Sequence, residues 1–513
     1  MMHLGISYNW VNKNILLLSC LIGLVTFAVL LLLKAMVSMS YLADISGSET
    51  STILPIQLLV NGEPIYTDAE QAPFRLVQYT PIYFCIVSFF YQLTDWTATD
   101  VHKVFLTSRF FSLAFTLMAS AVAGFVVFLA SNRNKIVAVL SALYIYHVLA
   151  FWLLTGSRPD SLLVLLTASY ILTIYKALQS EKKGQNWWYL AIFLAVTAFF
   201  VKQSGAIHSI AIGAYFIVTK QWKMLFKITT AGILFFGAYL LILPINSLPL
   251  FFTNIIGGVA NSASFDWFYD WTLEKWVMQF TLIMILNIII STYHFAKKPN
   301  AFYLFLAIAS PLFFLFATLT STKIGAGVGY YQDYIILVVV QIASFLTEKR
   351  EQNKLGGEFG RIGISMYLVF VYFYIALNVF MTYKKVFIHD QSVSYIEQRR
   401  VVDFLKEEKG LKKEDWVLTE SQAAPDYFIR HFLFNQTLMP FKDLVYLADK
   451  NRTFDFTMFR QMMDKGQIRF VITDHKSLPT NILNHSFGNT LQLSSTIGQY
   501  DIYESKTLQN IEL

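Results

Sequence analysis

Long apolar runs separated by short polar segments dominate the first three quarters of the chain. The first run, residues 15–36, is longer than the core of a secretion signal and lacks a small-residue cleavage site, so we expect a retained helix. Ten further runs follow it. The expected spans are 15–36, 104–130, 136–154, 161–177, 187–201, 207–219, 225–245, 276–295, 301–320, 331–346 and 362–382. The pattern predicts an α-helical polytopic membrane protein with about eleven transmembrane helices.

A shorter apolar segment, residues 81–93, decides the orientation of every later helix. If this segment does not cross the membrane, the basic clusters at 133–135, 176–183, 220–227, 297–298 and 349–361 all lie on the side of the N-terminus. The positive-inside rule makes that side the cytoplasm. We therefore expect 81–93 to form an interfacial helix on the outer surface. The first outer loop is then 37–103, the second is 246–275, and the C-terminal tail is also outside.

From Tyr383 onward the apolar runs become short and charged residues return. Helix-like segments at 401–409 and 454–465 alternate with β-rich segments at 416–420, 469–474 and 500–504. This alternation predicts a small α/β layer. We expect a transmembrane core over 1–383 and an extracytoplasmic α/β domain over 384–513.

Composition agrees with this interpretation and excludes several function classes. The chain is 55% hydrophobic and only 14% charged, too apolar for a soluble globular protein. The net charge of +7 comes from basic residues in short loops, which orient helices and do not indicate nucleic-acid binding. Cys20 and Cys85 provide neither a disulfide framework nor a metal cluster.

Ionisable side chains near helix ends are candidates for chemistry, because charge is costly in a membrane unless it is paired or functional. Under the expected topology six such residues gather at the outer face. They are Asp44, Glu49, Arg109, Asp160, Lys202 and Asp333. Arg and Lys bind phosphate, and a carboxylate can act as a general base. The pattern favours a site that handles a phosphorylated lipid.

Several motifs resemble those of one family. The first loop reads G-S-E-T-S-T-I-L-P-I-Q-L-L-V-N-G-E-P-I-Y-T-D over 47–68 and Q-Y-T-P-I-Y over 78–83, and S-R-F-F-S-L follows over 108–113. Later come R-P-D at 158–160, V-K-Q-S-G at 201–205 and G-A-G-V-G-Y-Y-Q-D at 325–333. Their order and spacing resemble membrane-embedded glycosyltransferases of the GT-C type, in particular the bacterial branch related to protein O-mannosyltransferases and lipid A aminoarabinose transferases.

The resemblance implies an inverting transfer of a hexosyl or pentosyl group from a polyprenyl-phosphate-linked sugar to a hydroxyl of a lipid, glycan or protein acceptor. It further implies an active site outside a bacterial plasma membrane, and leaves open whether a divalent cation takes part. The family's acidic motif is commonly Asp-Glu or Asp-Asp, whereas this chain has Ser48-Glu49 with Asp44 upstream. We therefore expect Glu49 to be the base, with Asp44 as its substitute.

The remaining roles follow from the resemblance as well. Arg109, Lys202 and Gln203 are expected to bind the donor phosphate, and Asp160 to position the acceptor or a cation. The expected substrate-binding residues are Tyr66, Tyr79, Tyr331 and Asp333.

Each of these assignments has a structural alternative. Glu49 could be an exposed loop carboxylate, Asp160 could cap a helix, and Arg109 and Lys202 could extend to the membrane interface. The tyrosines could form an interfacial belt, and His208 fits a hydrogen-bonded interior histidine. A polysaccharide polymerase or ligase, or a transporter of envelope glycolipids, would also be polytopic. A transporter is expected to have interrupted helices and midplane charge.

Overall fold

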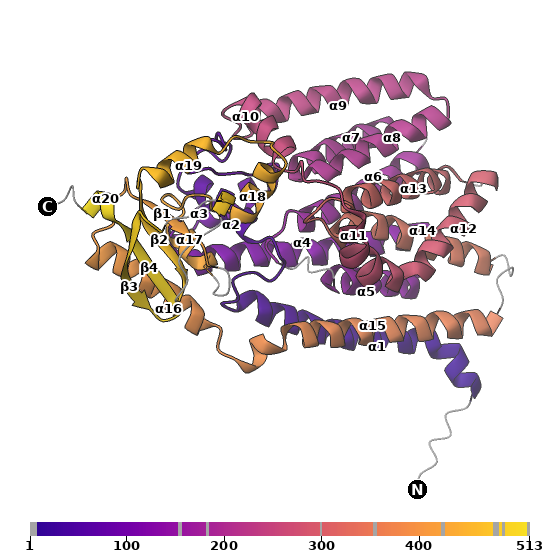
Figure 1. Ribbon diagram of the computed structural model, residues 1–513. Coiled ribbons are helices and arrows are strands. Elements are labelled where there is room, and N and C mark those ends of the chain that lie inside the picture. Colours follow the sequence, from indigo (N-terminus) through magenta and orange to yellow (C-terminus); the bar gives the residue numbers. More distant parts are fainter. Residues whose placement is uncertain are drawn as a thin grey trace, which may run out of the picture.

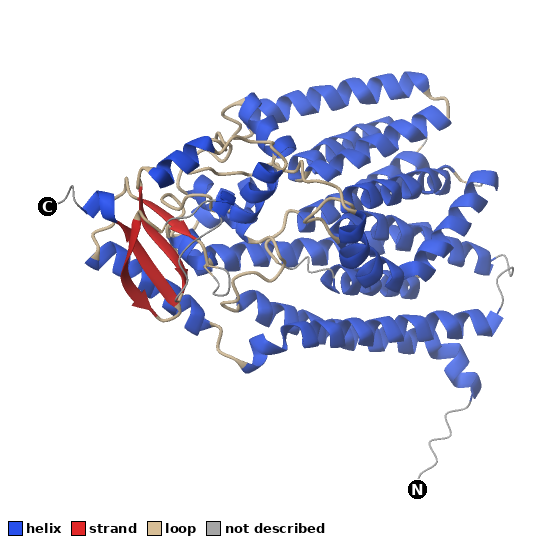
Figure 2. Cartoon of the chain, viewed as in Figure 1, coloured by secondary structure: helices blue, strands red, loops and turns tan. Residues whose placement is uncertain are grey.

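The computed structural model describes residues 8–151, 156–180, 184–297, 300–351, 357–421, 426–475, 482–484 and 488–509. Long helices lie side by side in a bundle, and a small sheet lies at one end of it (Figures 1 and 2). Every expected span overlaps a helix. The bundle helices are α1 (Tyr8–Met39), α4 (Val101–Ala130), α5 (Lys135–Phe151), α6 (Asp160–Gln179), α7 (Gly184–Val201), α8 (Ala206–Val218), α9 (Trp222–Ile242), α12 (Thr281–Lys297), α13 (Ala301–Ser321), α14 (Gln332–Glu351) and α15 (Gly357–Ile388). The end of the expected span 136–154 lies outside the described residues.

Length and composition of these helices confirm an integral multi-pass membrane protein. Within the described residues, eight helical segments are long and apolar enough to cross a membrane. The other three bundle helices, α5, α8 and α12, are apolar but shorter. The predicted helical polytopic architecture is therefore confirmed.

The first outer loop contains two short helices, α2 (Thr50–Val60) and α3 (Ile82–Gln92). The expected helix at 81–93 is α3. Its 11 residues extend about 16 Å at ~1.5 Å per residue, about half of a ~30 Å hydrocarbon core. Phe89 and Phe90 on its surface are 58% and 47% exposed, which fits an interfacial helix. Both short helices lie at the end of the bundle that carries the sheet (Figure 1).

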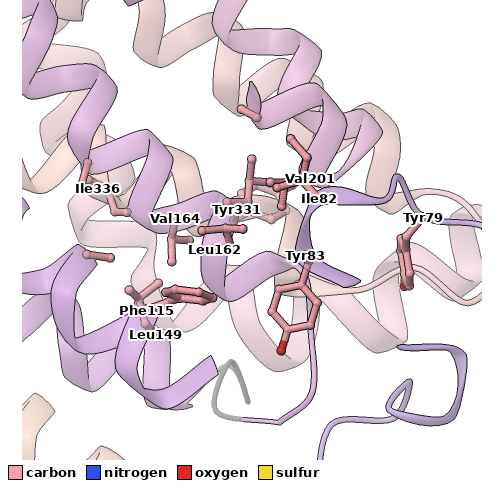
Figure 3. Packing of buried hydrophobic residues seen from close by; sticks show 14 of the residues in the cluster. Tyr79, Ile82, Tyr83, Phe115, Leu149, Leu162, Val164, Val201, Tyr331 and Ile336 are labelled. Carbon is pink, nitrogen blue, oxygen red and sulfur yellow. The ribbon is translucent and has the colours of Figure 1, made fainter. Parts of the chain in front are cut away.

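Close packing beneath this loop fixes α3 against the bundle. Figure 3 shows Tyr83 of α3 near Phe115 of α4 and Leu162 of α6, within one buried cluster. The Tyr83 hydroxyl also forms hydrogen bonds with the hydroxyls of Ser108 (3.0 Å) and Ser112 (2.7 Å). The loop therefore rests on a packed base of helices.

The second outer loop is built from very short helical segments. They are α10 (Leu248–Phe252), η2 (Thr253–Gly257), α11 (Phe265–Phe268), η3 (Tyr269–Val277) and η4 (Met278–Phe280). Ala263 in this loop forms a β-bridge with Lys323, which follows α13. The bridge holds the loop against the outer end of α13.

The tail is a mixed α/β layer, as predicted. Its strands β1 (Trp416–Thr419), β2 (Ile468–Asp474), β3 (Leu491–Ile497) and β4 (Tyr500–Ser505) have the order β1-β2-β4-β3. β1 and β2 are parallel, and the other two pairs are antiparallel. The tail's helical segments are α16 (Ser392–Asp403), η6 (Phe404–Glu408), α17 (Tyr427–Phe432), α18 (Lys442–Lys450), α19 (Thr457–Asp464), η7 (Ile482–Asn484) and α20 (Lys506–Gln509). The sequence pattern did not predict β3.

Part of the first outer loop belongs to the core of the tail. Phe74 is fully buried, and its ring packs against the rings of Phe456 (6.2 Å between centroids) and Phe459 (5.4 Å). The Met439 N–H donates to the Pro73 carbonyl (2.9 Å), which adds a backbone link. The first outer loop and the tail therefore share one hydrophobic core, and the expected boundary between 383 and 384 does not separate two independently packed units.

Candidate active site

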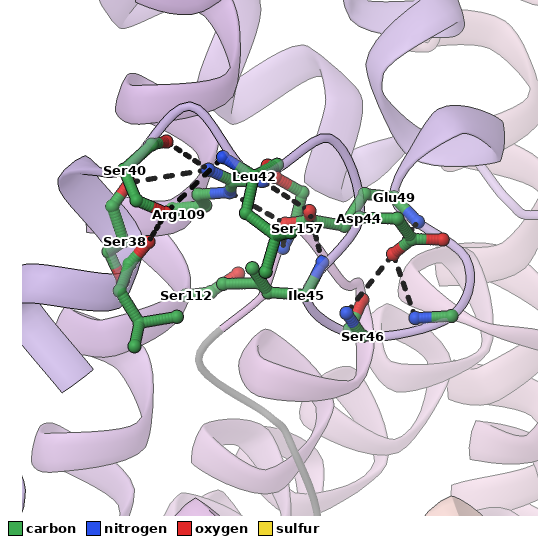
Figure 4. Close-up of polar contacts among 12 residues, drawn as sticks. Ser38, Ser40, Leu42, Asp44, Ile45, Ser46, Glu49, Arg109, Ser112 and Ser157 are labelled. Atoms are coloured by element: carbon green, nitrogen blue, oxygen red, sulfur yellow. Dashed lines mark hydrogen bonds and ion pairs between the residues drawn. The ribbon is translucent and has the colours of Figure 1, made fainter. Parts of the chain in front are cut away.

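Glu49 and Arg109 form a buried ion pair that joins the first outer loop to α4. Arg109 Nε donates to Glu49 Oε1 (2.9 Å), and Nη2 donates to Oε2 (2.6 Å) (Figure 4). The backbone N–H groups of Ser157 (2.7 Å) and Ile45 (2.9 Å) donate to the same two oxygens. Glu49 is 0% exposed. Because Glu49 is buried, it is not the exposed loop carboxylate of the structural alternative. Because both of its oxygens already accept two hydrogen bonds each, the geometry argues against Glu49 as the general base.

Arg109 is committed to the same structural task. Its remaining N–H groups donate to the carbonyls of Ser40 (3.1 Å) and Leu42 (2.6 Å). A guanidinium binds a phosphate through its N–H donors, and these contacts already occupy the N–H groups of Arg109 that would do so. The predicted donor-phosphate role of Arg109 is therefore not supported, because its side chain is turned into the loop.

Asp44, unlike Glu49, keeps one carboxylate oxygen available. Its Oδ1 accepts the N–H groups of Ser46 (3.1 Å) and Gly47 (2.8 Å). No hydrogen bond within the described residues goes to Oδ2. Burial and the nearby Glu49 charge raise the pKa of Asp44 to about 6. A half-buried carboxylate with one free oxygen and a pKa just below neutrality has the properties of a general base.

A second group of charges surrounds Asp160, the first residue of α6. Lys202 Nζ donates to Asp160 Oδ1 (2.8 Å), and Arg158 Nε lies 3.5 Å from Oδ2. The Lys202 ammonium also lies over the rings of Tyr330 (4.6 Å to the centroid) and Tyr79 (5.6 Å). Lys202 is thus an interior, paired residue and does not extend to the interface.

These neighbours determine the protonation state of Lys202. Burial would lower the pKa of Lys202, but the adjacent Asp160 carboxylate outweighs it and raises the pKa above its ordinary value. Lys202 therefore remains a cation at neutral pH. Arg158 connects this group to the first loop, since its Nη1 donates to the Ser46 carbonyl (3.2 Å). Arg158 thus links Asp160 to the loop that carries Asp44.

A cavity opens beside Lys202. Its walls come from the first loop (78–79), the segment after α7 (202–204), the second outer loop (259 and 261), the end of α13 (316 and 320) and the segment after it (323–326 and 330). Leu444 and Leu447 of α18 also line the cavity. Lys323 is a second cation in this cavity, and its Nζ donates to the Val259 carbonyl (3.0 Å). Burial and the charge of Lys202 lower the pKa of Lys323 to about 8. The cavity is thus lined by two basic side chains, Lys202 and Lys323.

Some of the predicted residues line this cavity and others lie elsewhere. Tyr79, Lys202 and Gln203 line it, and Gln203 Nε2 donates to the Ile255 carbonyl (2.8 Å). Tyr66 is buried beside it, and its hydroxyl donates to the Tyr79 carbonyl (2.8 Å). Tyr66 therefore supports the wall and has no free surface for a substrate.

Tyr331 and Asp333 point into the helix bundle. The Tyr331 hydroxyl bonds to Thr318 Oγ1 (2.9 Å), and Asp333 Oδ1 accepts from Thr167 Oγ1 (2.7 Å). Thr167 also contacts His208 Nε2 (2.8 Å), so His208 is the hydrogen-bonded interior histidine that the sequence favoured. The geometry does not support direct substrate contacts for Tyr331 or Asp333.

For three residues of the site, Arg158, Lys323 and Tyr330, the sequence analysis predicted no role. Arg158 stands in the R-P-D motif, and Tyr330 precedes Tyr331 in the later aromatic pair. Both were therefore visible as parts of motifs. Lys323 stands in none of the quoted motifs, and its place in the cavity depends on contacts with the second outer loop, including the β-bridge to Ala263.

The tail packs against the first outer loop next to the candidate active site. Gln57 of α2 donates to the His431 carbonyl (3.0 Å), and the rings of Phe105 and Phe428 pack edge to face at 5.6 Å. These contacts hold α17 beside the first loop, where burial and the Asp44 charge raise the pKa of Tyr427. The tail thus borders Asp44 with α17 and the cavity with α18.

A metal site is not evident in the described part of the chain. No group of three or more His, Cys, Asp or Glu side chains among those residues is arranged to hold a metal ion. Glu49 is instead paired with Arg109, and Asp160 with Lys202.

Comparisons with known proteins place this geometry in context. Residues 92–248 match the model of the family described as dolichyl-phosphate-mannose-protein mannosyltransferase. A search of curated proteins finds no match.

Among solved structures, ArnT from Cupriavidus metallidurans bound to undecaprenyl phosphate is similar, with a TM-score of 0.55 and 11% identity over 94% of this chain and 97% of that one. Its apo state gives a TM-score of 0.57, also at 11% identity, over 94% of this chain and 98% of that one. The archaeal oligosaccharyltransferase AglB from Archaeoglobus fulgidus, in complex with an inhibitory peptide and a dolichol-phosphate, gives 0.51 at 11% identity over 91% of this chain and 70% of that one. At such low identity these likenesses establish the fold.

The fold extends over nearly the whole of both ArnT structures, and the family match covers α4 through the start of α10. The predicted resemblance is confirmed: residues 92–248 match the protein mannosyltransferase family model, and the fold of the chain is similar to that of ArnT.

Proposed function

We propose that this protein transfers a sugar from a polyprenyl-phosphate-linked donor to an acceptor hydroxyl, with inversion, at the outer face of the plasma membrane. One observation carries the proposal: Lys202 and Lys323 line a single cavity. Arg158 links the Asp160 partner of Lys202 to the loop of Asp44. The related ArnT and AglB structures contain undecaprenyl phosphate and dolichol-phosphate, which are ligands of the same class.

In the proposed reaction the donor phosphate lies between Lys202 and Lys323. Asp44 accepts the proton of the acceptor hydroxyl, and the oxygen attacks the anomeric carbon of the sugar. The bond from that carbon to the phosphate oxygen breaks, and its electron pair leaves with the polyprenyl phosphate. The two lysines stabilise the phosphate as its charge increases, which is the step where fixed cations contribute most.

Asp44 suits the base role because it is ionised at neutral pH and only half-buried. Glu49 is closer to the spacing of the family motif, but its oxygens are fully used by Arg109 and two backbone N–H groups. A base must bind the proton it removes, and Glu49 has no free lone pair for it. We therefore assign the base to Asp44 and a positioning role to Glu49.

The test compares Asp44→Asn with Glu49→Gln in purified protein reconstituted in lipid vesicles. Donor binding and transfer are measured on the same samples, and each variant is normalised to folded protein. Asp44→Asn should lower turnover by about 10² to 10⁴, the usual contribution of a positioned base, while donor binding persists. Normal turnover in Asp44→Asn would refute the assignment, and absence of polyprenyl-phosphate binding in the unmodified protein would refute the proposed function.

A further inference from the structure

Three buried polar atoms near the cavity have no hydrogen-bond partner in the described structure. They are Asp160 Oδ2, Arg158 Nε and Gln332 Nε2. Asp160 and Gln332 are each 1% exposed, so bulk water does not satisfy them. The 3.5 Å separation of Arg158 Nε from Asp160 Oδ2 makes an ion pair, but it is too long for a good hydrogen bond. Buried polar groups are nearly always paired, so these atoms indicate a missing partner.

The three side chains converge on Gly329. A Cβ at this position would lie 3.2 Å from Gln332 Nε2, 3.5 Å from Asp160 Oδ1 and 3.8 Å from Arg158 Nη2. Because Gly329 has no side chain, no Cβ crowds these three groups. Its neighbour Tyr330 lines the cavity. The three side chains therefore lie close to the residue that precedes Tyr330 in the cavity wall.

The donor and acceptor pattern defines the chemistry of the missing partner. Arg158 Nε and Gln332 Nε2 offer N–H donors, and Asp160 Oδ2 offers an acceptor. A hydroxyl group fits this set, since it can accept from the two N–H groups and donate to the carboxylate. A phosphate has no proton to donate to Asp160, and an ammonium cannot accept from Arg158.

The charges around this point also select the ligand. Arg158 and Lys202 both flank the single Asp160 carboxylate, and Lys323 is in the same cavity. The surroundings are net positive, which disfavours a cationic amino sugar. A neutral sugar carrying hydroxyl groups is compatible.

We propose that Asp160, Arg158 and Gln332 form the subsite that recognises a hydroxyl of the transferred sugar, and that the donor carries a neutral sugar. This inference rests on the proposed function, because the sugar reaches the subsite when its phosphate is held by Lys202. Gln332 thereby becomes a specificity-determining residue. Gly329 keeps the space that the hydroxyl needs.

Two glycines provide a matched test. Gly329→Ala adds a methyl group to the subsite, whereas Gly327→Ala adds the same methyl where nothing lies within 4 Å. Binding of sugar-free polyprenyl phosphate and of polyprenyl-phosphate glucose is measured for both variants and for Gln332→Leu. Gly329→Ala and Gln332→Leu should weaken glucose-donor binding about tenfold, as expected for about one lost hydrogen bond, and leave sugar-free binding within about twofold. Gly327→Ala should bind both as the unmodified protein does.

A third variant tests the charge argument. Gln332→Glu keeps the shape of the side chain and adds a negative charge, so it should improve binding of a polyprenyl-phosphate 4-amino-4-deoxy sugar relative to the glucose donor. The unmodified protein should prefer the glucose donor.

Three outcomes overturn the subsite while leaving the proposed function intact. In the first, Gln332→Leu loses binding of the sugar-free lipid and of the glucose donor equally. In the second, neither Gln332→Leu nor Gly329→Ala weakens binding of any of these lipids. In the third, the unmodified protein binds the amino-sugar donor better than the glucose donor. Failure of the unmodified protein to bind any of these lipids would instead overturn the proposed function, and the subsite with it.

Discussion

Glu49 and Arg109 are 60 residues apart in sequence but share a buried two-point ion pair, with N–O distances of 2.9 and 2.6 Å. The pair anchors the loop that carries Asp44 to α4. We therefore expect substitution at either position to act first on stability. Loss of one partner of a buried pair typically costs about 3 to 5 kcal/mol because it leaves the other charge uncompensated.

The first prediction is that Glu49→Gln and Arg109→Ala both lower the thermal unfolding temperature in detergent. Donor binding per folded molecule should change little, since neither side chain lines the cavity. The double variant Glu49→Gln/Arg109→Met removes both charges and should regain part of the lost stability. An unchanged unfolding temperature in Glu49→Gln, together with loss of turnover, would show that Glu49 acts in chemistry.

The second prediction concerns pH. Burial and the Glu49 charge raise the pKa of Asp44 to about 6, so its base form predominates above that pH and is lost below it. Single-turnover rates at saturating donor should be flat above about pH 7 and fall about tenfold per pH unit well below 6. In Asp44→Asn the acidic limb of this profile should disappear, and its persistence would assign the limb to another group.

The third prediction separates cavity cations from surface cations. Lys202→Ala and Lys323→Ala should each weaken binding of sugar-free polyprenyl phosphate, with a loss of about tenfold to a hundredfold for a charge-assisted contact. Lys202→Ala should also lower turnover, because the phosphate gains charge in the transition state. Lys223 is an exposed lysine at the start of α9 and serves as the control, so Lys223→Ala should bind normally. Comparable losses in all three variants would indicate general attraction to anionic lipid.

The fourth prediction tests the shared core of the first loop and the tail. Phe74→Ala removes a buried ring that contacts Phe456 and Phe459, and should cost about 3 to 5 kcal/mol. Limited proteolysis should then cleave the tail sooner than in the unmodified protein. Phe89→Ala, at an exposed ring of α3, should leave cleavage unchanged. Equal protease resistance of Phe74→Ala would mean that the tail folds without the loop.

The fifth prediction is the sidedness of the membrane. Single cysteines replace Asn132, Asn300 and Asn489 in a background lacking Cys20 and Cys85, and intact cells are treated with an impermeant thiol reagent. The positive-inside rule predicts protection at Asn132 and Asn300 and labelling at Asn489 in the tail. Labelling from outside at Asn132 would reverse the predicted topology.

Apolar runs were enough to predict the bundle. A membrane-spanning segment must form all its backbone hydrogen bonds internally, so a long run of apolar residues in a membrane protein indicates a helix. The partners of ionised side chains were not predictable in this way. Glu49 matched the family spacing, yet its carboxylate is used by Arg109 and by Ser157, which lies 108 residues further along the chain. Spacing in a loop does not determine which way a side chain turns.

Adjacent tyrosines illustrate the same limit. Tyr331 was the predicted substrate contact, but its hydroxyl bonds to Thr318 inside the bundle, while Tyr330 lines the cavity. Both residues belong to the turn η5 (Val328–Tyr331), where neighbouring side chains diverge. The motif identified the turn, and only the three-dimensional packing distinguishes its two rings.

The burial of Phe74 in the tail has a consequence for biosynthesis. Phe456 and Phe459 are translated several hundred residues after Phe74, a delay of roughly 20 to 80 s at ~5 to 20 residues per second. During most of that interval the ribosome is still synthesising the bundle helices, and the rings of Phe456 and Phe459 are not yet present to cover Phe74. The packing of the first loop against the tail can therefore form only after most of the chain has been synthesised, which makes it a late step in the folding of this protein.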